Sequence, residues 1–110
     1  KILVMGLTFK ENCPDIRNTK VVDLVDNLKA SGAVVDVHDP WVNANAARDI
    51  TGLDLITEPK KHHYDCVVIA VAHGEFSKNG PSGVRQFAKK KSVIYDVKYL
   101  FSESDTDGRP

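Results

Sequence analysis

The sequence has little cysteine and no cysteine cluster, which excludes two classes of protein. Only two of its 110 residues are cysteine, Cys13 and Cys66, and neither belongs to a CxxC motif or to a Cys/His pair with the spacing of zinc ligands. We therefore expect neither a bound metal ion nor a secreted scaffold held by disulfides. A reducing compartment, the cytoplasm, is the expected location.

Net charge and long apolar runs are also missing. Lys and Arg total 15, Asp and Glu also total 15, and the formal net charge is zero. No basic field is present to attract nucleic acid or an anionic membrane surface. The longest apolar run, Cys66 to Ala72, is far shorter than the ~20 residues that span a bilayer. We expect no nucleic-acid partner and no membrane partner.

The length and the two ends of the chain predict its organisation. A chain of 110 residues fits one domain, which we expect over residues 1–101, followed by a polar, frayed tail at 102–110. The chain opens with Lys1 and enters an apolar strand pattern at once. We therefore expect it to be a piece of a longer protein.

The apolar pattern predicts strands that alternate with helices. Strands are expected at Ile2–Met5, Ala33–His38, Leu53–Ile56 (a short edge strand), Cys66–Val71 and Val93–Tyr95. Helices are expected from Val21 to a stop at Gly32, at Ala44–Ile50, as one turn at Pro59–Tyr64, and at Val84–Lys90. This order predicts an α/β fold: a doubly wound, mostly parallel five-stranded sheet with helices on both faces. Ligands of such sheets bind beyond the carboxyl ends of the strands, so the residues that follow each strand are the candidates for a site.

The segment between the first strand and the first helix is long and carries two cations. Ordinary loops of this kind have ~2–6 residues, and this one is clearly longer. Lys10 and Arg17 could meet phosphate here, ahead of a helix N-terminus that Asn18 or Thr19 is expected to cap. The alternative from spacing alone is that these cations form local ion pairs with Asp15 on a solvated loop.

The glycine-rich fingerprint of dinucleotide-binding domains is absent. The first strand is followed by a single glycine, Gly6, where GxGxxG would be needed. Asp39 ends the second strand, where an acid could bond a ribose, but it lies well beyond the usual spacing of ~20 residues. We therefore do not expect this domain to hold NAD in the standard Rossmann manner, and Asp39 is also explained by a turn that ends the strand.

Other polar residues follow the later strands. His73 and Glu75 could form an acid/base pair, although a structural histidine is the favoured interpretation. Lys98 is expected to converge with Lys10 on an anionic ligand, or else to be an ordinary exposed lysine. Cys66 is expected to be buried, and no histidine in the same motif would activate Cys13. We assign no catalytic residue.

Four segments together resemble one family. The segments GLTFKENCPDIRNTKVVDLVDNL, VDVHDP, VVIAVAHGEF and VIYDVKYLF resemble the C-terminal, UDP-sugar-binding domain of the UDP-glucose/GDP-mannose dehydrogenase family. They agree with it in order and spacing over nearly the whole chain. The resemblance is greatest to the bacterial branch that oxidises UDP-N-acetylhexosamines to uronic acids for surface polysaccharides.

The resemblance implies a Rossmann-like domain within a three-part enzyme. The other parts would be an N-terminal NAD-binding domain and a helical linker, and the parent enzyme would be a homo-oligomer. Enzymes of this family use NAD to oxidise the sugar C6 hydroxyl to a carboxylate through a thiohemiacetal on a cysteine, and the substrate implied here is a UDP-N-acetylhexosamine or UDP-glucose. Neither Cys13 nor Cys66 matches that cysteine, so we expect this fragment alone to be inactive.

The resemblance also implies roles for four residues. Phe9 and Lys10 align with positions that contact the UDP-sugar, and Arg17 aligns with an arginine that reaches NAD on the other domain. Lys98 stands where some relatives have an arginine that contacts the UDP-sugar. Lysine offers a point charge in place of the two-pronged guanidinium, so the contact would be geometrically different.

Two alternatives come from other functional classes. A receiver-type signalling domain has this length, a doubly wound sheet and a lysine after the last strand. It needs an acidic pair after the first strand to hold magnesium, where this chain reads Gly6-Leu7-Thr8. The second alternative is a scaffold domain with no ligand.

Overall fold

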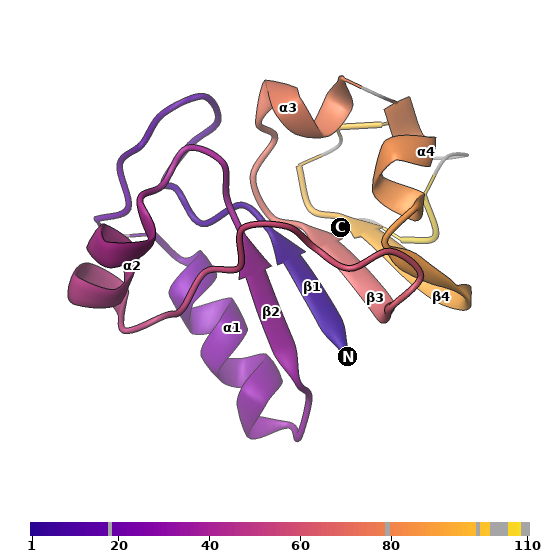
Figure 1. Cartoon of the computed structure of the whole chain (residues 1–110), viewed down its shortest axis with the longest axis horizontal. Helices are drawn as coiled ribbons and strands as arrows, with labels where there is room; N and C mark the ends of the chain where they lie inside the picture. The colour runs from indigo at the N-terminus through magenta and orange to yellow at the C-terminus, as the bar shows by residue number, and fades with distance from the viewer. Residues whose placement is uncertain (18, 79, 99, 102–105, 109–110) are drawn as a thin grey trace.

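A single parallel sheet forms the centre of the molecule. The computed structural model describes residues 1–17, 19–78, 80–98, 100–101 and 106–108. Within them, the sheet contains β1 (Ile2–Met5), β2 (Val35–His38), β3 (Tyr64–Ile69) and β4 (Ala88–Asp96) in the order β2-β1-β3-β4. Every neighbouring pair is parallel. Figure 1 shows the four strands side by side.

Helices cover both faces of this sheet. The first two, α1 (Val21–Ala30) and α2 (Ala44–Thr51), lie on one face, and the two short helices α3 (Gly74–Ser77) and α4 (Gly80–Arg85) lie on the other (Figure 1). This arrangement confirms the doubly wound α/β fold, with four strands in the described residues where five were expected.

The strand pleat divides the core into two apolar clusters. Successive side chains of a strand point to opposite faces, so Val4 packs with Val25 of α1 while its neighbour Leu3 packs with Phe76 of α3. Val4, Val25 and Leu3 are fully buried. Each such side chain contributes roughly 1.5–3 kcal/mol relative to an exposed one. The clusters fix the sheet between its two helical layers.

The strand register brings the carboxyl ends of the strands into one row. Met5 pairs with His38 on one side and with Ile69 on the other, and Ile69 pairs with Asp96. The chain leaves β1 for β2 and then returns to the far side of β1 for β3. The direction of strand order therefore reverses between β1 and β3, which is where open α/β sheets bind ligands.

Gly6 turns the chain sharply at this point. Its φ of +104° lies in the region that favours glycine, and a Cβ added there would lie 2.6 Å from the Val71 Cβ. Glycine is therefore required at this position, because the first loop passes too close to the segment after β3 for a side chain to fit.

Three sequence predictions differ from the structure. The expected helix at Val84–Lys90 is wrong, because α4 ends earlier and Ala88 already pairs with Tyr64 of β3. The expected turn of helix at Pro59–Tyr64 is also wrong. The expected edge strand Leu53–Ile56 is reduced to one bridge between Leu55 and Val37.

The described part of the C-terminal segment is bonded to the sheet. The backbone N–H groups of Asp107 and Gly108 both donate to the Ile94 carbonyl, and Gly108 forms a bridge with Tyr95. These residues differ from the frayed tail expected at 102–110, of which residues 102–105 and 109–110 lie outside the described part. The boundary after residue 101 stays a prediction.

The four helices are short and mixed in polarity. In the part of the chain that the structure describes, none is long and apolar enough to cross a membrane.

Candidate functional site

An open groove lies where the strand order reverses. Its volume is about 520 Å³, and its walls come from the first loop, the start of α1 and the segments that follow β3 and β4. The lining residues are Thr8, Phe9, Thr19, Lys20, Val21, Leu24, Ala70, Val71, Val97 and Lys98. The groove therefore occupies the place that the fold predicts for a ligand.

The charge of this groove is positive. Lys20 and Lys98 line it, and its lining residues within the described chain include no Asp or Glu. The N-terminal turn of α1 also forms part of the wall, and free N–H groups at a helix start favour anions. The expected N-cap at Asn18 or Thr19 is not confirmed, because Lys20 is the N-cap of α1 and Asn18 lies outside the described residues. Thr19 precedes that position, and its Oγ1 accepts a 3.2 Å hydrogen bond from the Val21 N–H. The groove is suited to an anionic ligand with an apolar portion.

The structure brings some of the predicted residues together and separates others. Phe9, with 60% of its surface exposed, and Lys98 both line the groove. Lys10 is exposed beside Phe9 but is not among the groove's lining residues. Arg17 lines a second, separate groove. Lys20 was missed by the sequence reasoning, although its place directly before α1 was the signal that could have found it.

Arg17 is held by its neighbour Asp15. The Asp15 Oδ1 accepts a 2.9 Å hydrogen bond from the Arg17 backbone N–H and lies 3.3 Å from the Arg17 Nε. These two hydrogen bonds lower the pKa of the Asp15 carboxyl from its ordinary value. Of the local ion pairs considered for this loop, the one between Arg17 and Asp15 is present, but the Arg17 side chain remains 78% exposed and accessible to a partner.

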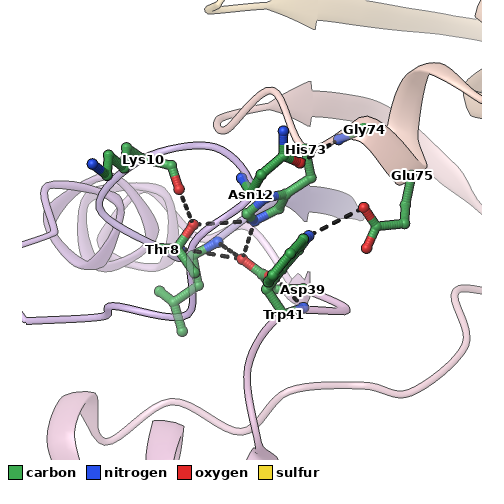
Figure 2. Close-up of polar contacts among 9 residues, drawn as sticks. Thr8, Lys10, Asn12, Asp39, Trp41, His73, Gly74 and Glu75 are labelled. Atoms are coloured by element: carbon green, nitrogen blue, oxygen red, sulfur yellow. Dashed lines mark hydrogen bonds and ion pairs between the residues drawn. The ribbon is translucent and has the colours of Figure 1, made fainter.

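A buried polar network lies beneath the first loop. Asp39, His73 and Thr8 are 4%, 0% and 1% exposed. The Asp39 Oδ2 lies 2.9 Å from the His73 Nε2 and accepts hydrogen bonds from the backbone N–H groups of Leu7 (2.6 Å) and Thr8 (3.2 Å). The Asp39 Oδ1 accepts a third backbone hydrogen bond, 2.8 Å from Trp41. Figure 2 shows these groups converging from the ends of β1, β2 and β3.

The hydrogen bonds assign the proton of the His73 ring. The backbone N–H of Asn12 donates to the His73 Nδ1 at 2.9 Å, so that nitrogen is an acceptor. The Nε2 then carries the hydrogen and donates to Asp39, with the Thr8 Oγ1 3.1 Å away. The Thr8 hydroxyl in turn donates its own hydrogen to the Lys10 carbonyl at 2.8 Å. Each polar atom of the network thus has a partner of the right kind.

The environment of Asp39 shifts its titration. Burial raises the pKa of this carboxyl, but the hydrogen bonds from His73, Leu7 and Trp41 favour the charged form and outweigh burial. The net result is a pKa below the ordinary value of 3.8. Asp39 is therefore a buried carboxylate that is stabilised by hydrogen bonds from the segments following β1, β2 and β3.

The interpretation of His73 and Glu75 as an acid/base pair is wrong, and the structural interpretation of His73 is supported. Glu75 accepts a 3.1 Å hydrogen bond from the Trp41 indole Nε1, while His73 is fully buried and bonded to Asp39. The Trp41 ring stacks on His73, with 5.9 Å between ring centroids, and Phe76 contacts the ring edge-on at 5.4 Å. Both rings keep the imidazole from solvent.

The two cysteines are both half-buried and lie in different surroundings. Cys66 is half-buried within β3, and burial raises the pKa of its thiol, which disfavours the thiolate. Cys13 is half-buried and lines the second groove with Arg17 and Trp41. Among the described residues, no cluster of His, Cys, Asp and Glu has the geometry to hold a metal ion.

Comparison with known proteins matches nearly the whole chain to one family. The model of the UDP-glucose/GDP-mannose dehydrogenase family, UDP binding domain, matches residues 3–103. UDP-N-acetyl-D-glucosamine 6-dehydrogenase of Pseudomonas aeruginosa is 48% identical over 99% of this chain and 26% of its own length. The enzyme of the same name from Salmonella typhi is 44% identical over 98% of this chain and 25% of its own length.

A solved structure shows the same fold. The UDP-D-ManNAc dehydrogenase from Pyrococcus horikoshii superposes with a TM-score of 0.74 and 22% identity, over 98% of this chain and 24% of that one. This chain therefore spans about a quarter of the length of the relatives that it matches. The receiver-type signalling domain and the ligand-free scaffold find no support in these matches.

Proposed function

Because this chain belongs to the UDP-glucose/GDP-mannose dehydrogenase family, we propose that it is the UDP-binding domain of an NAD-dependent nucleotide-sugar 6-dehydrogenase. The proposed substrate is a UDP-N-acetylhexosamine, as in the two curated relatives, and the product is the uronic acid for polysaccharide synthesis. We place the enzyme in the cytoplasm as a homo-oligomer that also contains an NAD-binding domain and a helical linker.

The groove at the strand-order reversal carries this proposal. A UDP moiety combines a diphosphate with a uracil ring, and the groove combines Lys20 and Lys98 with an apolar wall and the exposed ring of Phe9. The two lysines face the diphosphate, assisted by the start of α1. Lys10, next to Phe9 in the chain, contacts the substrate from the rim.

This chain does not fit NAD as its main ligand. The turn after β1 has one glycine, and Gly6 is closely packed against Val71, so a dinucleotide phosphate has no glycine cradle there. The Asp39 carboxylate is buried and hydrogen-bonded to protein donors, so it is not available to a ribose. NAD is held by the remainder of the enzyme, and Arg17 reaches toward it from its exposed position.

The positions of these residues assign nucleotide binding to this chain and the oxidation to the rest of the enzyme. Oxidation of a primary alcohol to a carboxylate would transfer two hydrides from C6 to two molecules of NAD, take the second carboxylate oxygen from water and release the protons to solvent. In this chain, Phe9, Lys20 and Lys98 bind and orient the nucleotide portion, so the sugar extends toward the rest of the enzyme. We assign no nucleophile or base of the reaction to the residues of this chain that the structure describes.

Calorimetry with UDP, uridine and the 110-residue chain tests the proposal. We expect UDP to bind at least ten times more tightly than uridine, because the lysines act on the diphosphate. Lys98→Ala should weaken UDP binding by roughly tenfold without changing uridine binding. Lys29→Ala, which removes an exposed lysine from the far end of α1, is the matched control and should leave the UDP affinity unchanged. Equal affinities for UDP and uridine, or an unchanged Lys98→Ala variant, would contradict the proposal.

A further inference from the structure

We propose that the buried network of Asp39, His73 and Thr8 is a positioning device, which fixes the loop backbone that presents Phe9 and Lys10 to the nucleotide-sugar. The inference rests on the proposed function for the identity of the ligand. It adds three buried residues, of which Asp39 and His73 do not line the groove and Thr8 lines it at the base of the loop. Its basis is the set of hydrogen bonds between this network and residues 7–12 (Figure 2).

The network holds the loop on both sides of the exposed pair. On one side, the backbone N–H groups of Leu7 and Thr8 donate to the Asp39 carboxylate. On the other side, the Asn12 N–H donates to the His73 Nδ1 at 2.9 Å. Phe9 and Lys10 lie between these two anchors.

A third contact reaches the exposed pair itself. The Thr8 Oγ1 donates to the Lys10 carbonyl at 2.8 Å, so a buried hydroxyl holds the backbone of an exposed residue. The side chains of Phe9 and Lys10 remain in solvent, and Figure 2 shows the Lys10 ammonium directed away from His73 and Asp39. The network thus orders the backbone and leaves both side chains available to a ligand.

Asn12 extends the device to the segment that follows β3. Asn12 has a φ of +54°, and its Oδ1 accepts a 2.9 Å hydrogen bond from the Gly74 N–H. The first loop is therefore fastened to the start of α3 as well as to the end of β2. A loop ordered before the ligand arrives does not lose its conformational freedom on binding, and this preserves affinity.

The matched pair Thr8→Val and Thr8→Ser tests the positioning role. Valine keeps the shape of threonine but removes the hydroxyl that holds the Lys10 carbonyl, while serine restores that hydroxyl. In calorimetry with UDP, we expect Thr8→Val to bind roughly tenfold more weakly than the wild-type chain and Thr8→Ser to bind within about twofold of it.

Tyr64→Phe controls for a general loss of stability. The Tyr64 hydroxyl donates a 2.6 Å hydrogen bond to the Asp36 Oδ2, and Tyr64 is 1% exposed at the start of β3, the opposite end of the strand from the groove. Tyr64→Phe removes one part-buried hydroxyl hydrogen bond, as Thr8→Val does. We expect Tyr64→Phe to lower the urea midpoint yet leave the UDP affinity within about twofold of wild type.

A measurement without ligand separates this inference from the proposed function. Backbone ¹⁵N relaxation should give Phe9 and Lys10 order parameters near ~0.85 in the wild-type chain and in Thr8→Ser, falling below ~0.6 in Thr8→Val. If the wild-type chain fails to bind UDP but the loop loosens in this way, the proposed function is wrong and the positioning role stands. Order parameters that stay high in Thr8→Val, or a Tyr64→Phe variant that loosens the loop equally, would overturn the positioning role.

Discussion

Two sets of polar residues lie side by side at the carboxyl edge of the sheet, and they differ in exposure. Lys20 and Lys98 stand in solvent along the groove, whereas Asp39 and His73 lie wholly inside the protein. The exposed lysines keep their hydration, so their positions cost the folded state little free energy. A substitution there is expected to change ligand binding and not stability. The buried pair has exchanged water for protein donors, so a substitution there changes the fold.

The difference shows how this kind of site is organised. Buried side-chain nitrogen and oxygen atoms in the described residues all have a hydrogen-bond partner, which is the condition for a polar network to stabilise a fold. The network fixes loops that come from three different strands, and the loops then carry exposed side chains to the ligand. Stability and binding are thereby assigned to different residues, and the following variants test that separation.

Asp39→Ala is expected to have the largest effect. It leaves the backbone N–H groups of Leu7, Thr8 and Trp41 and the His73 Nε2 without their acceptor in the interior. We expect a loss of about 3–5 kcal/mol in the free energy of unfolding, measured by urea denaturation. Asp54→Ala is the control, since that carboxylate pairs with Arg48 but is 76% exposed, and it should change stability by less than about 0.5 kcal/mol. Similar losses in the two variants would contradict the account.

Gly6→Ala is expected to have the second-largest effect on stability. The new methyl group would lie 2.6 Å from the Val71 Cβ and 2.9 Å from the Val71 backbone nitrogen, at a φ of +104°. Backbone strain and overpacking together should cost about 2–4 kcal/mol in the same denaturation experiment. Gly32→Ala also places alanine at a positive φ, but nothing lies within 4 Å, so its smaller loss measures strain alone. An equal loss at both positions would show that the contact with Val71 is unimportant.

Acid should weaken the buried network selectively. The folded-state pKa of Asp39 is lowered, so its contribution to stability is complete above the ordinary value of 3.8 and is lost as the pH falls below that value. We expect the stability difference between the wild-type chain and Asp39→Asn to be constant near neutral pH and to shrink in the acid range. A difference that grows as the pH falls would reverse the sign and contradict the assignment of a stabilised carboxylate.

Arg17→Ala is expected to have the smallest effect on this chain. The side chain is 78% exposed and pairs only with its neighbour Asp15 in the described structure. Unfolding free energy should change by less than about 0.5 kcal/mol, and UDP affinity should be unchanged. In the full-length enzyme, the same variant should raise the KM for NAD, and an unchanged KM would remove the proposed role of Arg17.

Local sequence patterns predicted the elements whose signals are strong. The apolar run Ile2–Met5 became β1 with those bounds, and the apolar stripe from Val21 became α1. The helix prediction failed at Ala88–Lys90, where residues of good helix propensity form the start of β4. Ala88 pairs with Tyr64 of β3, and the lysines that follow lie in the register shift before Val93 pairs with Cys66, with their side chains exposed.

The site was predictable only in part, for a physical reason. Placement after a strand end pointed to Lys98, because parallel strands end at the same edge of a sheet, whereas Phe9 came only from the family resemblance; both line the groove. The contact between Asp39 and His73 joins residues 34 positions apart and depends on β2 and β3 lying on opposite sides of β1. No local pattern contains that strand order, so the network became visible only in the fold.

The most direct test of the groove as a nucleotide site is a titration of the ¹⁵N-labelled chain with UDP, followed by two-dimensional NMR. We expect the amide signals of Phe9, Lys20, Val71 and Lys98 to shift in a saturable manner, while those around Arg17 in the second groove stay in place. Saturable shifts confined to the second groove, or no shifts at millimolar UDP, would contradict the assignment.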